Sequence, residues 1–150
     1  MAFKLSQKSL DKLKGVDERL VKIVHDAIKI STVDFSVGEG LRTLERQHLL
    51  MSQGKAKTEN SRHLTGHAVD LWAFVNGSVS WQESYYADIA HAMRDSAVKH
   101  GVILRWGAVW DRVLNDIKNT ELEPVEYVKR RKAQGKKAFL DYVHFEIKKE

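Results

Sequence analysis

The feature that most constrains the fold is an apolar run over residues 68–75 with one carboxylate inside it. This run is long enough for a buried strand, and Asp70 is its charged residue. Asn76-Gly77 follows at once, a strong signal for a two-residue hairpin turn, and Val79 and Trp81 continue on the far side. Because a buried carboxylate is costly unless it is paired, hydrogen-bonded or bound to a metal, Asp70 is expected in a special environment.

Helices and strands alternate along the rest of the chain. Helical spacing of apolar residues predicts helices over residues 16–29, 44–53, 83–100 and 120–134. Alternating or continuous apolar residues predict strands over 33–37, 102–106 and 139–147. Gly38 and Gly40 indicate a turn after the first strand, and residues 55–62 are expected to form a loop. The pattern predicts one α+β domain over residues 1–150, with a largely antiparallel sheet and flanking helices.

Composition removes several classes of chemistry. The chain has no cysteine, so disulfides, thiolate catalysis and cysteine-based zinc sites are excluded, whereas seven histidines leave a His and carboxylate metal site open. The net charge of +5 favours anionic partners such as nucleic acid, a membrane surface or an anionic cell wall, without choosing among them. The N-terminal lysines are not followed by an apolar run, so we expect no signal peptide and no membrane insertion.

The residues just before the apolar run suggest a metal site. His63 and His67 precede Asp70 closely enough that, in a helix, all would share one face. Gly66 and the strand-like run that follows argue against a helix, and a loop leading into a strand would need a distant third ligand. His144, on the last predicted strand, is the candidate for that ligand. The alternative is a hydrogen-bonded structural pair, which is the usual role of a histidine beside an aspartate.

Two motifs resemble a known family. Ser-x-His-x-x-Gly-x-Ala-x-Asp spans Ser61 to Asp70, and Asp-x-x-His-x-Glu spans Asp141 to Glu146. Together they resemble the zinc D-Ala-D-Ala carboxypeptidase superfamily, which implies a Hedgehog/DD-peptidase-like fold. Its closest branch here is the phage endolysins that cleave the L-alanyl–D-glutamate bond of peptidoglycan. Residues 5–16 and 40–47 are also similar to these endolysins, so the resemblance covers most of residues 4–74 and 139–147.

The resemblance implies a role for each matching residue. It implies Zn²⁺ as the cofactor, with His63, Asp70 and His144 as ligands, Asp141 as the catalytic carboxylate, Arg42 as the cation beside the oxyanion, and Gln47 and Ser61 near the substrate. His67 falls on a variable position of the motif and is not expected to be a ligand. Zinc lowers the pKa of its bound water towards about 7, which suits hydrolysis at neutral pH.

The spacing of the second motif carries a geometric condition. Asp141 and His144 have opposite parity, so on a regular strand they would face opposite sides of the sheet. Asp141 must therefore lie before the regular strand or at a bulge. Glu146 shares the parity of His144 and is a candidate partner for it, or a less favoured base.

Several alternatives remain open at this point. An endopeptidase that lyses bacteria competes with a D-Ala-D-Ala carboxypeptidase and with a non-catalytic, zinc-containing module that binds the cell wall. A nucleic-acid-binding protein is disfavoured because the aromatic residues are not interleaved with the basic run at residues 129–132. For the endolysin we expect a peptidoglycan peptide as substrate, a monomer, and no separate wall-binding domain. It would stay in the host cytoplasm until a membrane-permeabilising protein releases it.

Other residues have two readings each. Trp106 and Trp110 either line a substrate cleft or belong to the core. The basic run at 129–132 is either a solvated helix face or an attraction to an anionic wall. The acidic side chains that might form a second cation site, although scattered carboxylates seldom do, are Asp116, Glu121, Glu123 and Glu126.

Overall fold

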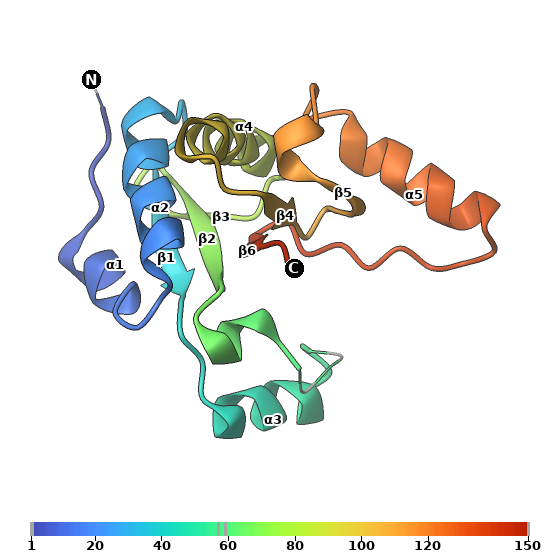
Figure 1. The fold of residues 1–150 in the computed structure, drawn as a ribbon, viewed down its shortest axis with the longest axis horizontal. Coiled ribbons are helices and arrows are strands. Elements are labelled where there is room, and N and C mark those ends of the chain that lie inside the picture. The colour runs from blue at the N-terminus through green and yellow to red at the C-terminus, as the bar shows by residue number, and fades with distance from the viewer. Residues whose placement is uncertain (1, 57, 59, 150) are drawn as a thin grey trace.

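A twisted antiparallel sheet forms the centre of the computed structural model, which describes residues 2–56, 58 and 60–149 (Figure 1). Lys57 and Glu59, in the expected 55–62 loop, lie outside the described residues. The strands are β1 (Phe35–Glu39), β2 (Ala68–Val75), β3 (Ser78–Ser80), β4 (Leu104–Trp106), β5 (Val109–Val113) and β6 (His144–Ile147). Their order is β1-β2-β6-β4-β5, with β3 also paired to β2. The predicted α+β class with an antiparallel sheet is confirmed.

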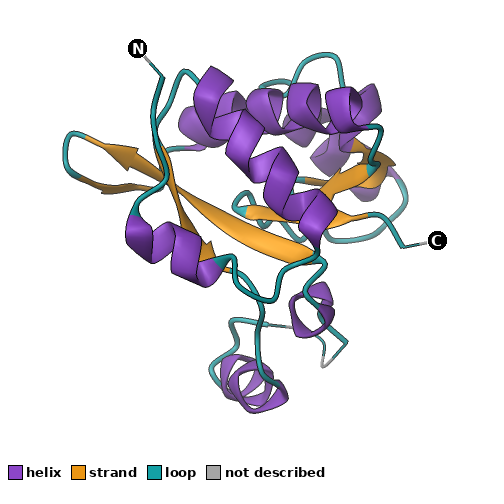
Figure 2. Ribbon diagram, turned by 60° about the vertical axis from the view of Figure 1, so that its left-hand side comes forward, coloured by secondary structure: helices purple, strands orange, loops and turns teal. Residues whose placement is uncertain are grey.

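Two long helices cover one face of this sheet (Figure 2). The helices are α1 (Gln7–Lys12), α2 (Glu18–Ile30), α3 (Leu44–Ser52), α4 (Glu83–His100) and α5 (Glu123–Ala133), with short 3-10 turns η1 (Arg62–Thr65) and η2 (Leu114–Asp116). The core joins α2 and α4 to the strands through fully buried side chains, among them Leu20, Ile23, Val24, Ala27, Ile89, Met93, Ala97, Val69, Leu71 and Ala73. Burial of each large apolar side chain contributes about 1.5–3 kcal/mol, so this face is the main source of stability.

The other face of β2 carries polar and aromatic side chains. Asp70, Trp72 and Phe74 alternate with the buried residues and therefore point away from α2 and α4. Asp70 lies directly opposite His144 in the register of β2 and β6. The sheet thus presents two of the candidate ligands side by side on its open face.

Helix α1 closes the outer edge of β1. Ser9, which is 1% exposed, accepts a hydrogen bond at Oγ from the Val37 amide (2.9 Å), and Lys12 Nζ donates to the Gly38 carbonyl (3.0 Å). The expected turn at Gly38 is wrong, because β1 continues through it to Glu39 with an irregular register. Gly38 is required there by close packing, since a Cβ would lie 2.1 Å from the ring of Trp72.

Several element boundaries differ from the sequence prediction. The hairpin turn is confirmed, with Asn76 and Gly77 both at positive φ as a type I′ turn requires. The last strand begins at His144 rather than at residue 139, and α5 covers 123–133 rather than 120–134. Helix α1 and strand β5 were not anticipated. Within the described residues, every helix is too short or too polar to cross a membrane.

Candidate metal centre

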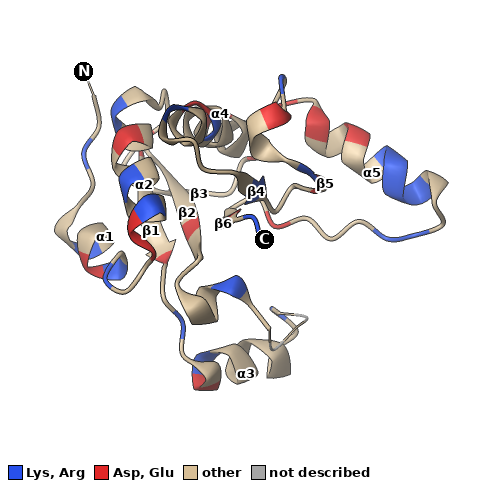
Figure 3. Ribbon diagram, viewed as in Figure 1, with Lys and Arg blue, Asp and Glu red and all other residues tan. Residues whose placement is uncertain are grey.

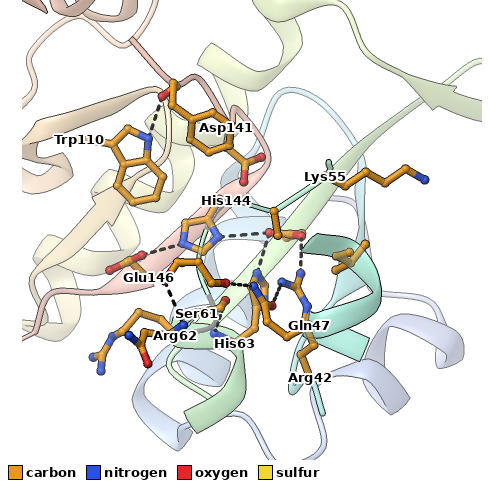
Figure 4. A pocket seen from close by; sticks show the side chains of 16 residues that line it. Arg42, Gln47, Lys55, Ser61, Arg62, His63, Trp110, Asp141, His144 and Glu146 are labelled. Carbon is orange, nitrogen blue, oxygen red and sulfur yellow. Dashed lines mark hydrogen bonds and ion pairs between the residues drawn. The ribbon is translucent and has the colours of Figure 1, made fainter. Parts of the chain in front are cut away.

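Three potential metal ligands converge on the open face of the sheet (Figure 4). His63 comes from η1, Asp70 from β2 and His144 from β6, and one donor atom of each lies within 4.8 Å of the others. His63 Nε2 is 3.0 Å from Asp70 Oδ1, and His144 Nδ1 is 3.4 Å from the same oxygen. All three side chains are largely buried, with 2%, 13% and 8% exposure respectively.

Local geometry aims His63 at the cluster. The Ser61 side chain accepts a hydrogen bond from the His63 amide and begins the turn η1. Gly66 ends the turn in the left-handed conformation (φ 77°), and a Cβ there would lie 2.5 Å from the Gly15 carbonyl oxygen. Glycine is therefore needed at this position for both backbone conformation and space. The motif residues Ser61 and Gly66 thus set the path of the chain on either side of His63.

Each histidine is held by a second hydrogen bond on its outer nitrogen. His63 Nδ1 lies 2.9 Å from the Gly40 carbonyl oxygen, and His144 Nε2 lies 2.7 Å from Glu146 Oε1. Because both partners are acceptors, these nitrogens carry the protons when the rings are neutral, which leaves His63 Nε2 and His144 Nδ1 free to bind a metal. Glu146 therefore orients His144, as the shared parity in the sequence suggested.

The donor set and its spacing fit a zinc ion. Tetrahedral zinc with ligand bonds of about 2.0–2.1 Å separates neighbouring ligand atoms by roughly 3.3 Å. The two separations from Asp70 Oδ1, 3.0 and 3.4 Å, are close to this value, and all three donor atoms lie within 4.8 Å of one another. His67 does not join the cluster: its Nδ1 contacts Thr65 Oγ1 and its Nε2 faces Asp17.

The electrostatics of the cluster favour positive charge at its centre. Burial lowers the pKa of His144, but hydrogen bonds with Asp70 and Glu146 outweigh burial and raise this pKa to about 9. Burial raises the pKa of Asp70, but hydrogen bonds from His144 and His63 outweigh burial and hold this pKa well below its ordinary value. The cluster is therefore suited to a cation bound between the three side chains.

Asp141 lies beside the cluster, on the segment that leads into β6. It precedes the regular strand, as the parity argument required, and its amide donates to the Gly107 carbonyl (2.9 Å). Its carbonyl oxygen would be 2.2 Å from a Cβ at Gly107, so glycine permits this close approach. Burial raises the pKa of the Asp141 carboxyl, and the negative charge of Asp70 raises it further. Figure 4 shows the Asp141 side chain on the His144 side of the cleft.

Arg42 connects the cluster to a buried polar network. Its Nε and Nη2 donate to the two carboxylate oxygens of Glu39 (2.7 and 2.8 Å), and its Nη1 donates to Gln47 Oε1 (2.7 Å). Nη2 also lies 3.7 Å from Asp70 Oδ2, and Gln47 donates onward to the Thr58 carbonyl. Sequence reasoning missed Glu39; its place at the irregular end of β1, opposite Asp70, depends on a register that only the folded sheet reveals.

The three candidate ligands, Arg42 and Asp141 line a cleft of about 450 Å³, whose wall also includes Trp110 and Phe139. Trp110 Nε1 donates to the Phe139 carbonyl (2.9 Å), and the Trp110 ring centroid is 5.3 Å from that of His144. Trp106 is instead fully buried and stacks on Phe145. Trp110 therefore belongs to the cleft wall, and Trp106 belongs to the core.

Two of the acidic residues after β5, Glu123 and Glu126, are engaged in ion pairs. Glu123 contacts Arg130 and Arg112, and Arg130 also binds Asp111 through two hydrogen bonds. In the part of the chain that the structure describes, the proposed second set of carboxylates does not converge as His63, Asp70 and His144 do. The basic run at 129–132 lies on the last turns of α5 (Figure 3).

A His/Asp/His donor set beside a further carboxylate, within an open cleft, is the arrangement of a metal-dependent hydrolase. The chain belongs to the phage L-alanyl-D-glutamate peptidase family, whose sequence profile matches residues 1–124. It is 29% identical over 116 residues to the L-alanyl-D-glutamate peptidase of Escherichia phage T5, a match that covers 74% of this chain and 84% of that relative.

A solved structure extends the likeness beyond residue 124. The crystal structure of the Serratia marcescens L-Ala D-Glu endopeptidase ChiX matches with a TM-score of 0.74 and 35% sequence identity. The match covers 98% of this chain and 91% of that one. Asp141 and His144 follow the residues of the family match but lie in this nearly complete structural match. The family resemblance expected from the two motifs is confirmed.

Proposed function

We propose that this chain is a zinc-dependent endopeptidase that cuts the L-alanyl–D-glutamate bond of peptidoglycan stem peptides and so lyses bacterial cells. The family membership and the two similar enzymes support the bond and the substrate. The observation that carries the metal chemistry is the convergence of His63, Asp70 and His144 in a cleft that Asp141 also lines.

His63 Nε2, Asp70 Oδ1 and His144 Nδ1 would hold the ion, which supplies a Lewis acid and a water of lowered pKa. Asp141 takes the proton from the attacking water and passes it to the leaving amine. Burial raises the pKa of this carboxyl above its ordinary value, and a carboxyl that accepts a proton more readily is suited to carry one between water and amine.

Arg42 serves this chemistry mainly by position. Its guanidinium holds Glu39 and Gln47 and lies beside Asp70, so it fixes a ligand and adds positive charge near the developing oxyanion. Gln47 and Ser61 both line the cleft, where we propose that they border the bound peptide. The buried side chains form one continuous core, which supports a single catalytic domain over residues 1–150, and we propose that it acts as a monomer.

The proposal is tested with purified bacterial sacculi, with and without a chelator, by mapping new peptide termini with mass spectrometry. We expect new D-glutamate amino termini that disappear with the chelator and in Asp141→Asn. The matched control is Asp88→Asn, an exposed carboxylate on α4. Release of free D-alanine would show a carboxypeptidase instead, and bound zinc without any cleavage would show a non-catalytic wall-binding module.

A further inference from the structure

We propose that the open face of the sheet carries a second site, a lysine-rimmed groove that binds the glycan strand of the wall polymer. The groove lies between α1 and the β1–β2–β3 end of the sheet, and its volume is about 440 Å³. This inference rests on the proposed function, because it assigns the groove to the same polymer whose stem peptides enter the metal cleft. It adds a binding site for the part of that polymer that is not cut.

The floor of the groove is apolar and aromatic. Ser36 pairs with Trp72 and Phe74 pairs with Val79, so these four side chains share the face of the sheet that α2 and α4 leave uncovered. Trp72 lies against the Gly38 backbone, and Phe74 is 40% exposed. Exposed aromatic surface in a concave site is unusual on a stable protein and is typical of a ligand-binding groove.

The rim of the groove is basic. Lys4, Lys8 and Lys12 line it and are exposed, against a single acidic residue, Asp34. Figure 3 shows basic positions along the N-terminal segment and α1. Lys12 is anchored by its bond to the Gly38 carbonyl, so its charge is held at the groove edge. This excess of positive charge is complementary to a ligand that carries carboxylates.

The groove continues the face that holds the metal cluster. Asp70, Trp72 and Phe74 are alternate residues of β2, so successive side chains are about 7 Å apart along one face. Sugar rings present flat apolar faces that can stack on Trp72 and Phe74, and the carboxylates of the stem peptides carried along the strand would meet the lysines. A glycan held there would run beside the cleft, with a stem peptide directed towards Asp70.

Glycan strands trimmed to the L-alanine of each stem peptide are the direct probe, because they keep a stem carboxylate but contain no scissile bond, and they can be titrated into the intact enzyme. We expect about fivefold weaker binding for Phe74→Ala and for Lys4→Gln/Lys8→Gln, and a binding constant that falls as salt rises. The matched control is Lys22→Gln, an exposed lysine on the opposite face of the sheet, with unchanged glycan binding. Equal glycan affinity in all variants, or no glycan binding by the native protein, would contradict the proposal that the groove binds glycan.

A short soluble stem peptide separates this inference from the proposed function. In the groove variants, the rate on sacculi should fall several-fold relative to the rate on the peptide, with circular dichroism confirming the fold. If the native enzyme cleaves the peptide but does not bind glycan, the proposed function is supported and the proposed glycan site is contradicted. If the native enzyme cleaves neither substrate, the proposed function is contradicted. The glycan titration would still show whether the groove binds glycan.

Discussion

The metal cluster and the region around α5 contribute to one cleft but are held by different kinds of structure. His63 and His144 are buried, Asp70 is largely buried, and both histidines contact the Asp70 carboxylate. Asp141 instead lies on the segment between β6 and α5, a helix that projects from the body of the protein (Figure 1). An ion pair between Arg130 and Asp111 ties α5 to β5. The arrangement of the three candidate ligands therefore depends on the sheet and η1, whereas Asp141 depends on a loop segment that the Gly107 carbonyl and the core packing of its neighbours hold in place.

The largest effect is expected from loss of a ligand. Asp70→Ala should abolish zinc binding and lower activity by at least about 10³-fold, because both the Lewis acid and the activated water are lost. Zinc content by elemental analysis and the melting temperature with and without added zinc check this. His67→Ala is the control and should keep one zinc per chain. A fully active Asp70→Ala enzyme would contradict the metal assignment.

Asp141→Asn should separate turnover from metal binding. We expect a loss of kcat of about 10²–10⁴-fold, the usual cost of removing a general base, with zinc content unchanged. The substitution keeps the size of the side chain, so the bond from the residue 141 amide to Gly107 should persist. Loss of zinc together with activity would mean that Asp141 supports metal binding. It would contradict the view that the ligands and Asp141 are held independently.

Glu39→Gln tests whether the network around Arg42 supports the cluster. It removes a charge partner from a buried guanidinium that faces Asp70, so we expect a loss of about 10–100-fold in zinc affinity or kcat. The variant Glu45→Gln, at an exposed position of α3, is the control. Competitive titration with a fluorescent chelator gives the zinc affinity, and native affinity together with native kcat would exclude a positioning role for Glu39.

The smallest effect is expected at the ion pair of the α5 region. The hydrogen bond from Arg130 lowers the pKa of Asp111, so the pair stabilises the fold above the ordinary carboxyl pKa and is lost as pH falls through the lowered value. Asp111 is 35% exposed, so Asp111→Asn should cost less than about 1 kcal/mol at pH 7. Thermal unfolding should show the difference at pH 7 and its loss as the pH falls below the ordinary carboxyl range. A constant difference across this range would assign the cost to packing.

Local sequence patterns correctly predicted those elements in which the buried residues also lie in a regular helix or strand. The β2 hairpin and the helices α2 and α4 follow directly from apolar periodicity and turn residues. Residues 139–143 were predicted as strand because Leu140, Tyr142 and Val143 pack against the core, but the backbone bonds of this segment to Gly107 and Leu71 do not form a regular ladder. The alternation of apolar and polar residues reflects burial, and it does not show whether the backbone forms a regular strand ladder.

The site was predictable to the extent that it is encoded in short motifs. Ser61, His63, Asp70 and His144 lie at motif positions, and the parity argument placed Asp141 ahead of β6. Glu39 and the lysine-rimmed groove were not predictable, because both depend on which strands lie next to each other. The register that sets Glu39 opposite Asp70 contains an irregularity that no local pattern specified.

The bond from Val37 to Ser9 also bears on how this protein behaves when it is concentrated. An open strand edge is a template on which other chains can add, and β1 would offer such an edge if α1 were absent. Ser9 Oγ takes the acceptor position that a foreign strand would otherwise fill, and Lys12 covers the next carbonyl. The short N-terminal helix therefore acts as a guard against intermolecular β-sheet growth, and its removal would favour aggregation before it affected the chemistry of the cleft.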